Sequence, residues 1–194
     1  MSLIPAFKIG LWNAWILVLP FVLTIPFFIR IGKEKDVPDI PITSETGLSK
    51  IMMSFFVFSK FIYFPVIIYS IFLPLKLGTI WFYIGLPITL MGLVTYMILL
   101  MNWANTPPSE PVTRGLYRYS RHPMYVTTSL FFLGLTIISA SWVLLLITTI
   151  VIVGEVIFIG LEEQGCLEHY GEDYREYMNR TPRWIGIPKS KKKL

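Results

Sequence analysis

Two short stretches of the sequence carry the residues best suited to chemistry. The stretch LYRYSRHPMYV contains Arg121, His122 and Tyr125, and a later apolar run ends in the acidic pair Glu162-Glu163. These side chains provide a cation, an imidazole ring, a phenol and two carboxylates. Such a set favours a pocket for a polar cofactor, built where an apolar substrate can also reach it.

The composition indicates which environment surrounds these residues. Hydrophobic residues make up 54% of the 194-residue chain and charged residues 15%, against roughly 45–50% and about 25% in soluble proteins. Mean hydropathy is +0.62. The net charge of +5 lies at the ends of apolar segments, so it indicates membrane orientation rather than a nucleic-acid partner. Cys166 is the only cysteine, which excludes an internal disulfide.

The apolar segments predict an all-α integral membrane protein. A spanning helix needs roughly 20 apolar residues, and residues 9–31, 51–75 and 77–101 each meet this length. Residues 126–161 are too many for one span, and the sequence Ser-Ala-Ser at 139–141 predicts a tight helical hairpin there. We therefore expect about five transmembrane helices in a single domain, residues 1–194, the last two paired.

The distribution of lysine and arginine predicts the topology. With five spans, fourteen of the 17 basic residues fall on one side, which the positive-inside rule makes cytoplasmic. The carboxyl terminus is then cytoplasmic, and the polar segment 102–125 and the tail face the same compartment. The fourteen are Arg30, Lys33, Lys35, Lys50, Arg114, Arg118, Arg121, Arg175, Arg180, Arg183, Lys189, Lys191, Lys192 and Lys193.

Some polar residues have simpler explanations than catalysis. Lys60 and Glu155 lie within predicted spans, where a buried ion pair between them would satisfy both charges. The tyrosines Tyr170, Tyr174 and Tyr177 recur at helical spacing and predict a cytoplasmic carboxyl-terminal helix with an interfacial aromatic belt. The two histidines of the chain, without a cysteine pattern, do not predict a metal site.

The carboxyl-terminal half resembles the isoprenylcysteine carboxyl methyltransferase family. The resemblance rests on PVTRGLYRYSRHPMYV, a hydrophobic hairpin, and EEQGCLEHYGEDYREYMNRTPRWIG, and it covers residues 102–188. The family belongs to a wider group that includes phospholipid N-methyltransferases. Membership implies transfer of a methyl group from S-adenosylmethionine to a lipid-linked acceptor, with residues 102–188 as the catalytic portion.

The resemblance also implies roles for individual residues. Arg121 matches the family arginine, and Glu162 and Glu163 match the acidic pair on the substrate side; these three are the catalytic candidates. The expected cofactor contacts are Asn102, Ser109, Glu110, Pro111, Val112, Thr113, Leu116, Tyr117, His122, Pro123, Met124 and Tyr125.

The identity of the acceptor decides what the acidic pair must do. A prenylcysteine carboxylate, the first expectation, is ionised near neutral pH and needs no general base. A phospholipid amine, the alternative, must lose a proton, which would make Glu162 or Glu163 essential. Eukaryotic prenylcysteine enzymes carry an arginine one turn before the pair, whereas this chain has Phe158 and Ile159 there.

Two further hypotheses remain open from the sequence. Membrane sterol reductases share a similar carboxyl-terminal segment but bind NADPH, and this chain shows no cationic group reserved for a 2′-phosphate. A membrane scaffold without enzymatic activity would explain the apolar spans but not the spacing of the motifs.

Overall fold

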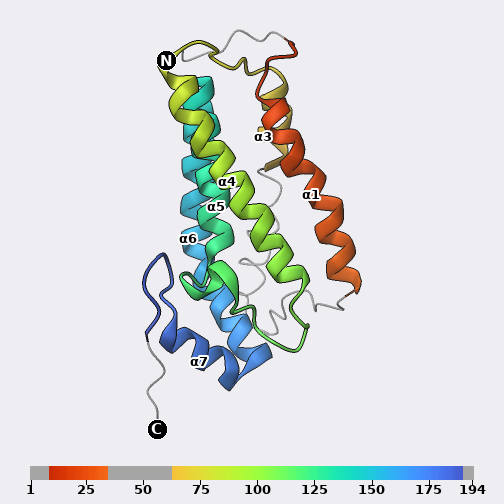
Figure 1. Cartoon of the computed structure of the whole chain (residues 1–194), viewed down its shortest axis with the longest axis vertical. Coiled ribbons are helices and arrows are strands. Elements are labelled where there is room, and N and C mark those ends of the chain that lie inside the picture. Colours follow the sequence, from red (N-terminus) through yellow and green to blue (C-terminus); the bar gives the residue numbers. More distant parts are fainter. Residues whose placement is uncertain (1–8, 35–62, 190–194) are drawn as a thin grey trace, which may run out of the picture.

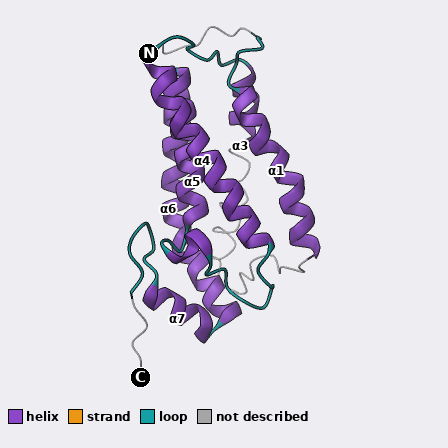
Figure 2. Cartoon of the chain, in the orientation of Figure 1, coloured by secondary structure: helices purple, strands orange, loops and turns teal. Residues whose placement is uncertain are grey.

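The computed structural model describes residues 9–34 and 63–189, and every regular element within them is a helix (Figure 2). This confirms the all-α prediction for that part of the chain. The long helices stand side by side (Figure 1). In chain order they are α1 (Trp15–Glu34), α3 (Tyr63–Ile71), α4 (Ile80–Ala104), the 3₁₀ turn η1 (Gly115–Arg118), α5 (Pro123–Ser139), α6 (Trp142–Tyr170) and α7 (Glu172–Arg180).

Helices α4 and α6 are long and apolar enough to cross a membrane. They contain 25 and 29 residues, or about 37 and 43 Å at 1.5 Å per residue, against a hydrocarbon core of about 30 Å. Their exposed faces are apolar, which suits contact with lipid better than contact with water. Those faces include Ile84, Met91, Val94, Ile98, Leu146, Ile150, Val153 and Ile157.

Of the five predicted spans, these two form helices that are both long enough and apolar enough to cross a membrane, within the described residues. The first predicted span becomes helical only at Trp15, because Asn13 turns toward the end of α3 and its amide donates to Ile71 O at 2.7 Å. In the second predicted span α3 is described, while residues 51–62 lie outside the described ranges. Helix α5 has 17 residues, or about 25 Å, so it is shorter than the membrane core.

The predicted hairpin between the last two apolar helices is confirmed. Only Ala140 and Ser141 separate α5 from α6. Ala140 adopts a left-handed conformation with φ of 49°, which ends α5. The Ser141 hydroxyl accepts a hydrogen bond from Leu144 N at 3.2 Å and so caps the start of α6.

Glycines allow α4 and α5 to approach closely. A Cβ added at Gly92 would lie 2.5 Å from Phe131 N, and one added at Gly85 would lie 2.7 Å from Ile138 N. Since the two helices are antiparallel neighbours (Figure 1), this contact sets the end of α4 beside the start of α5. The polar residues at both ends are thereby brought to one end of the bundle.

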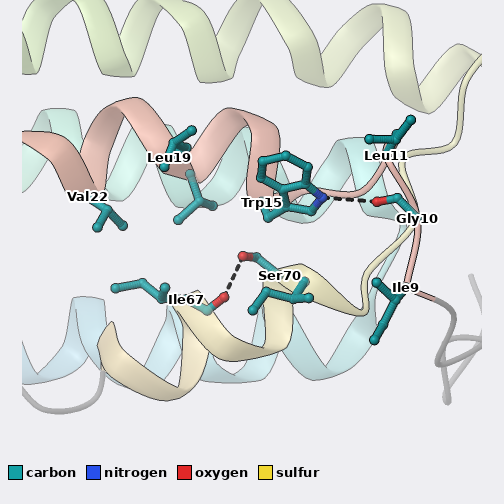
Figure 3. A pocket seen from close by; sticks show the side chains of 10 residues that line it. Ile9, Gly10, Leu11, Trp15, Leu19, Val22, Ile67 and Ser70 are labelled. Carbon is teal, nitrogen blue, oxygen red and sulfur yellow. Dashed lines mark hydrogen bonds between the residues drawn. The ribbon is translucent and has the colours of Figure 1, made fainter.

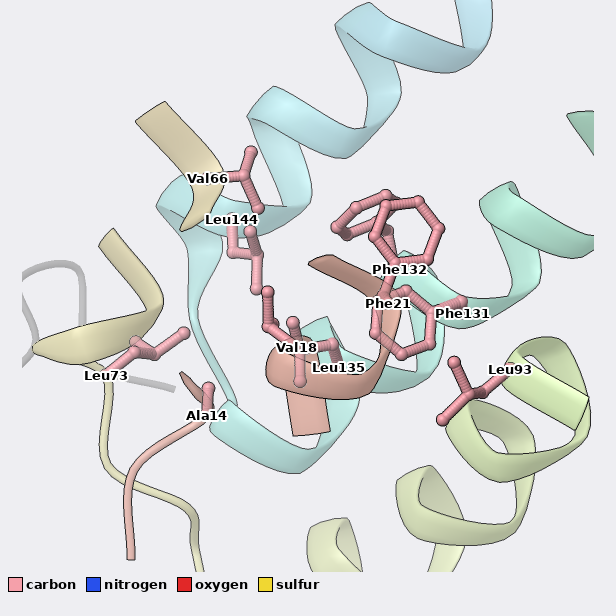
Figure 4. Close-up of a cluster of buried hydrophobic side chains, with 10 residues drawn as sticks. All are labelled: Ala14, Val18, Phe21, Val66, Leu73, Leu93, Phe131, Phe132, Leu135 and Leu144. Atoms are coloured by element: carbon pink, nitrogen blue, oxygen red, sulfur yellow. The ribbon is translucent and has the colours of Figure 1, made fainter. Parts of the chain in front are cut away.

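The apolar core joins α1 and α3 to this bundle. Phe21 of α1 stacks on Phe131 of α5 with ring centroids 5.2 Å apart, and Phe132 meets it edge-on at 5.5 Å (Figure 4). Val18 and Leu135 are fully buried in the same cluster. The core therefore holds α5 against α1 (Figure 4).

Candidate functional site

The start of α5 is the centre of the candidate site. His122 occupies the N-cap position and Pro123 the first turn of the helix, where proline's fixed φ favours helix initiation. The His122 backbone N–H donates to Ser120 Oγ at 3.1 Å, and the residue is only 4% exposed. The local sequence thus holds the imidazole ring in the protein interior.

Glu163 on α6 is the partner of that ring. Its Oε1 lies 3.2 Å from His122 Nε2 and 3.1 Å from Arg121 Nη2. Arg183, from the carboxyl-terminal segment, donates from Nε to Oε1 at 3.2 Å and from Nη2 to Oε2 at 2.6 Å. The Glu163 side chain is 5% exposed, so two arginines and a histidine compensate its buried charge.

Glu162 has a different environment from its neighbour. Its side chain is 34% exposed, and its Oε2 accepts a 2.5 Å hydrogen bond from the Tyr125 hydroxyl. His122 Nδ1 lies 3.8 Å from the same oxygen, and the His122 and Tyr125 rings stack at 5.8 Å. The structure therefore brings together five predicted site residues: Arg121, His122, Tyr125, Glu162 and Glu163.

Helix α7 packs against the loop that carries Arg121 and His122. Tyr177 donates from its hydroxyl to Tyr117 O at 2.7 Å and to Ser120 O at 3.2 Å. Tyr174 and Tyr177 are 5% and 3% exposed. The interfacial-belt prediction is thus wrong for these two tyrosines, because both side chains are buried. The Tyr177 hydroxyl holds α7 against the loop before α5. Trp184 is exposed.

Asn102 lies against the loop that leads into the site. It is in the last turn of α4, and a Cβ added at Gly115 would collide with its Nδ2. Gly115 has φ of +61°, a conformation that favours glycine. The Asn102 amide therefore packs directly against Gly115, the first residue of η1. The buried Tyr117 lies in the same 3₁₀ turn.

Two buried donors in this region fit the cofactor that the resemblance implies. Within the described ranges, Asn102 Nδ2 and Arg121 Nε are the buried side-chain polar atoms without a hydrogen-bond partner. Buried donors are nearly always satisfied in folded proteins, so such atoms call for a ligand or water. Both residues belong to the predicted set, and a nucleoside with an amino-acid end carries the acceptors that they need.

The other predicted cofactor contacts differ in how far their side chains are buried. Ser109 and Glu110 have exposed side chains in the loop between α4 and η1, outside the network around Glu163. Tyr117 and Pro123 are buried. The remaining predicted contacts are half-buried around them: Pro111, Val112, Thr113, Leu116 and Met124.

Three residues of the network were not among the predicted site residues: Ser120, Tyr177 and Arg183. Arg183 was counted only as a topological charge. A buried acidic residue needs a cation, which is the one general signal for such a pair. The choice of Arg183 depends on the return of the segment after α7 to this end of the bundle, which is a tertiary feature. For Ser120 and Tyr177, whose contacts are to backbone groups, the patterns of the sequence contain no comparable signal.

Glu155, which lies within α6, is outside this cluster. Ser129 donates to Glu155 Oε2 at 3.3 Å, in the middle of the hairpin. The expected partner of Glu155, Lys60, lies outside the described residues.

A cavity of about 600 Å³ lies at the opposite end of the molecule (Figure 3). It is bounded by the start of α1 and the end of α3. Its polar wall groups already have partners, since Trp15 Nε1 donates to Gly10 O at 3.0 Å and Ser70 Oγ donates to Ile67 O at 2.6 Å. The cavity is thus separate from the candidate site in place and in chemistry.

Comparison with known families agrees with this geometry. The family model for phospholipid methyltransferases matches residues 67–173, which include the three catalytic candidates Arg121, Glu162 and Glu163. That family belongs to the same group of integral membrane methyltransferases as the isoprenylcysteine enzymes. No curated protein and no solved structure gives a significant match. The matched range spans more than half of the chain, and the chain therefore belongs to the phospholipid methyltransferase family, a family of membrane methyltransferases.

Proposed function

We propose that this protein transfers a methyl group from S-adenosylmethionine to the amine of a phospholipid headgroup. The observation that carries this proposal is the unequal use of the two carboxylates. Glu163 is held by two arginines and His122, whereas Glu162 is partly exposed and bonded to Tyr125. Glu162 is thus the carboxylate that can meet an ammonium group.

The acceptor must be an unprotonated amine when it reacts. A lipid amine is an ammonium near neutral pH, and its positive charge is attracted to a partly exposed carboxylate. Glu162 would bind the ammonium and receive its proton, which can then pass to solvent because the side chain is 34% exposed. Tyr125 would hold the carboxylate in place through its 2.5 Å hydrogen bond.

A carboxylate acceptor would require a different arrangement. It needs a cation to bind it, but Arg183 binds both oxygens of Glu163. Arg121 also binds Glu163, and its remaining donor would be used by the cofactor. The turn before the acidic pair offers only the buried apolar side chains of Phe158 and Ile159. Methylation of an isoprenylcysteine carboxylate, which the sequence favoured first, is therefore the alternative, supported by the motif resemblance.

The chain's own residues supply binding and orientation. When bound, S-adenosylmethionine would supply a methyl group that the amine lone pair attacks, so that a C–N bond forms, the C–S bond breaks and S-adenosylhomocysteine leaves as a neutral thioether. Asn102, through its buried amide, and Arg121 would hold its polar groups. The buried His122 ring and the stacked Tyr125 ring would form one wall and exclude water. Holding both reactants in line is a large part of catalysis for such a displacement.

The proposed setting is the cytoplasmic interface of a multi-pass protein. The positive-inside distribution supports placing the carboxyl-terminal half, residues 102–188, on that side. A lipid headgroup would enter from the bilayer, while the cofactor would enter from the cytoplasm. NADPH-dependent reduction has no supporting feature in the site beyond the shared motif.

The test is to incubate the purified protein in lipid nanodiscs with S-adenosylmethionine labelled in its methyl group. One set of nanodiscs contains phosphatidylethanolamine, and a second contains phosphatidylcholine with a farnesylcysteine. We expect label in the first set that mild base does not release as methanol, because base cleaves the acyl esters of the lipid but not an N-methyl group. Base-labile label confined to the second set would show an ester and would replace the amine with the carboxyl alternative.

A binding measurement separates methyl transfer from reduction. Titration calorimetry should detect binding of S-adenosylhomocysteine and none of NADPH. Binding of NADPH without the nucleoside would refute the methyltransferase proposal altogether.

A further inference from the structure

The residues after α7 fold back onto the loop that precedes α5. Arg121 N donates to Pro182 O at 3.0 Å, Ser120 Oγ donates to Arg183 O at 3.3 Å, and Gly186 N donates to Tyr119 O at 2.9 Å. We name residues 181–189 the carboxyl-terminal strap. Three hydrogen bonds therefore fix the strap's backbone, and with it the origin of the Arg183 side chain.

From this fixed origin, Arg183 reaches the buried carboxylate of Glu163. Its Nε and Nη2 bind the two oxygens as a fork, at 3.2 and 2.6 Å. The Arg183 side chain is 48% exposed, while that of Glu163 is 5% exposed. Hydrogen bonding to Glu163 and attraction to its charge raise the pKa of Arg183. The strap thus neutralises a charge inside the protein from a position at its surface.

The orientation of Glu163 determines that of His122. A carboxylate bound by two arginines is ionised and can only accept hydrogen bonds. The 3.2 Å contact between His122 Nε2 and Glu163 Oε1 therefore has Nε2 as the donor. The other ring nitrogen, Nδ1, then faces Glu162 at 3.8 Å.

We propose that Arg183 is a positioning residue that acts through Glu163 to fix the tautomer and orientation of His122. The strap would then complete the site from beyond the matched family range, which ends at residue 173. The importance of His122 for cofactor binding rests on the proposed function, but the fixing of its ring does not. The two can be tested separately.

The direct test is nuclear magnetic resonance on protein labelled with ¹⁵N-histidine. The chain has two histidines, so His169→Gln leaves one ring and assigns the His122 signals. We expect a proton on Nε2 in the wild-type protein and in Arg175→Gln. Arg175 is a matched control, because it is 63% exposed and pairs with Glu172 on the surface. In Arg183→Gln the Nε2 proton signal should shift or exchange with an Nδ1-protonated form. An unchanged His122 spectrum would overturn the proposal.

A second measurement connects the ring to ligand binding. Arg183→Gln should weaken S-adenosylhomocysteine binding about ten- to hundredfold, the range expected for losing a charge-assisted hydrogen bond. Arg183→Lys, which keeps the charge but loses the fork, should fall between this variant and the wild type. Arg175→Gln should match the wild type. If the wild-type protein does not bind the nucleoside, the proposed function fails, while the histidine spectra still decide the role of Arg183.

A double variant keeps the proposal testable if Arg183→Gln alone fails to fold. Loss of Arg183 alone leaves a buried carboxylate with fewer partners, whereas Arg183→Gln with Glu163→Gln removes the charge as well. If Arg183 acts through Glu163, the double variant should bind the nucleoside no worse than Glu163→Gln alone. Additive losses would show that Arg183 acts independently of Glu163 and would overturn the proposal.

Discussion

The hydroxyl of Tyr177 lies 2.7 Å from the carbonyl oxygen of Tyr117, and this contact joins α7 to the loop before α5. The same hydroxyl donates to Ser120 O at 3.2 Å. Burial, partly opposed by the charge of Arg121, raises the pKa of Tyr177 and keeps its phenol protonated as a donor. The loop that carries Arg121 and His122 is therefore supported by a helix more than 50 residues later in the chain.

Tyr177→Phe should destabilise the protein without changing its surface. Two buried carbonyl oxygens would lose their donor, which costs about 1–3 kcal/mol in the free energy of unfolding. For a chain of this length we expect the melting temperature to fall by about 2–4 °C per kcal/mol. Thermal unfolding in detergent, followed by circular dichroism, measures this. Tyr119→Phe is the control, because Tyr119 is 49% exposed; an equal fall for both variants would contradict a specific role for Tyr177.

Gly92→Ala should loosen the packing of α4 on α5. The added Cβ would lie 2.5 Å from Phe131 N, and backbone cannot move aside as a flexible side chain can. Overpacking of this kind costs about 1–3 kcal/mol. Gly160→Ala is the control, because nothing lies within 4 Å of a Cβ there, and alanine favours a helix by about 1 kcal/mol relative to glycine.

Comparing the melting temperatures of these two alanine variants tests the close approach of the helices. We expect a fall for Gly92→Ala and no fall for Gly160→Ala. If Gly92→Ala unfolds at the wild-type temperature, α4 and α5 do not touch at this glycine.

The hydrophobic pattern predicted the helices well where local sequence decides them. The hairpin break at 139–141 was visible because three small residues interrupt a long apolar run. Helix α5 ends at Ser139, within this predicted break. The first span was predicted to begin at residue 9. Its helix starts at Trp15, because a tertiary hydrogen bond from Asn13 to Ile71 O competes with helix formation.

The site was predictable where its residues form a motif and unpredictable where a contact depends on tertiary structure. His122, Tyr125, Glu162 and Glu163 come together as their motif implied. Adjacent glutamates can have different environments because neighbouring residues on a helix point about 100° apart. The ion pair of Arg183 with Glu163 was not foreseen, because it depends on the chain reversing after α7, a turn that no hydrophobic period encodes.

Tyr125→Phe and Tyr125→Ala should have different effects on the site. Phenylalanine keeps a ring that can stack on His122 but removes the hydrogen bond to Glu162. We therefore expect Tyr125→Phe to bind S-adenosylhomocysteine like the wild type and to lower kcat about tenfold, a loss typical of one charge-assisted hydrogen bond. Tyr125→Ala should weaken nucleoside binding as well. Calorimetry and initial rates on phosphatidylethanolamine nanodiscs distinguish the two, and equal nucleoside affinities for both variants would show that the ring is not part of the cofactor wall.

Replacing each carboxylate by its amide should separate their roles. Glu163→Gln leaves Arg121, whose side chain is 10% exposed, without its ionic partner, and breaking a buried pair costs about 3–5 kcal/mol. Its melting temperature should therefore fall clearly.

Glu162→Gln changes a 34% exposed side chain, so its stability should stay within about 0.5 kcal/mol of the wild type. Its kcat on a lipid amine should fall about 10²- to 10⁴-fold, as for the loss of a general base, with nucleoside binding retained. If Glu162→Gln keeps full turnover on phosphatidylethanolamine while Glu163→Gln loses it without loss of stability, the two carboxylates have been assigned the wrong way round.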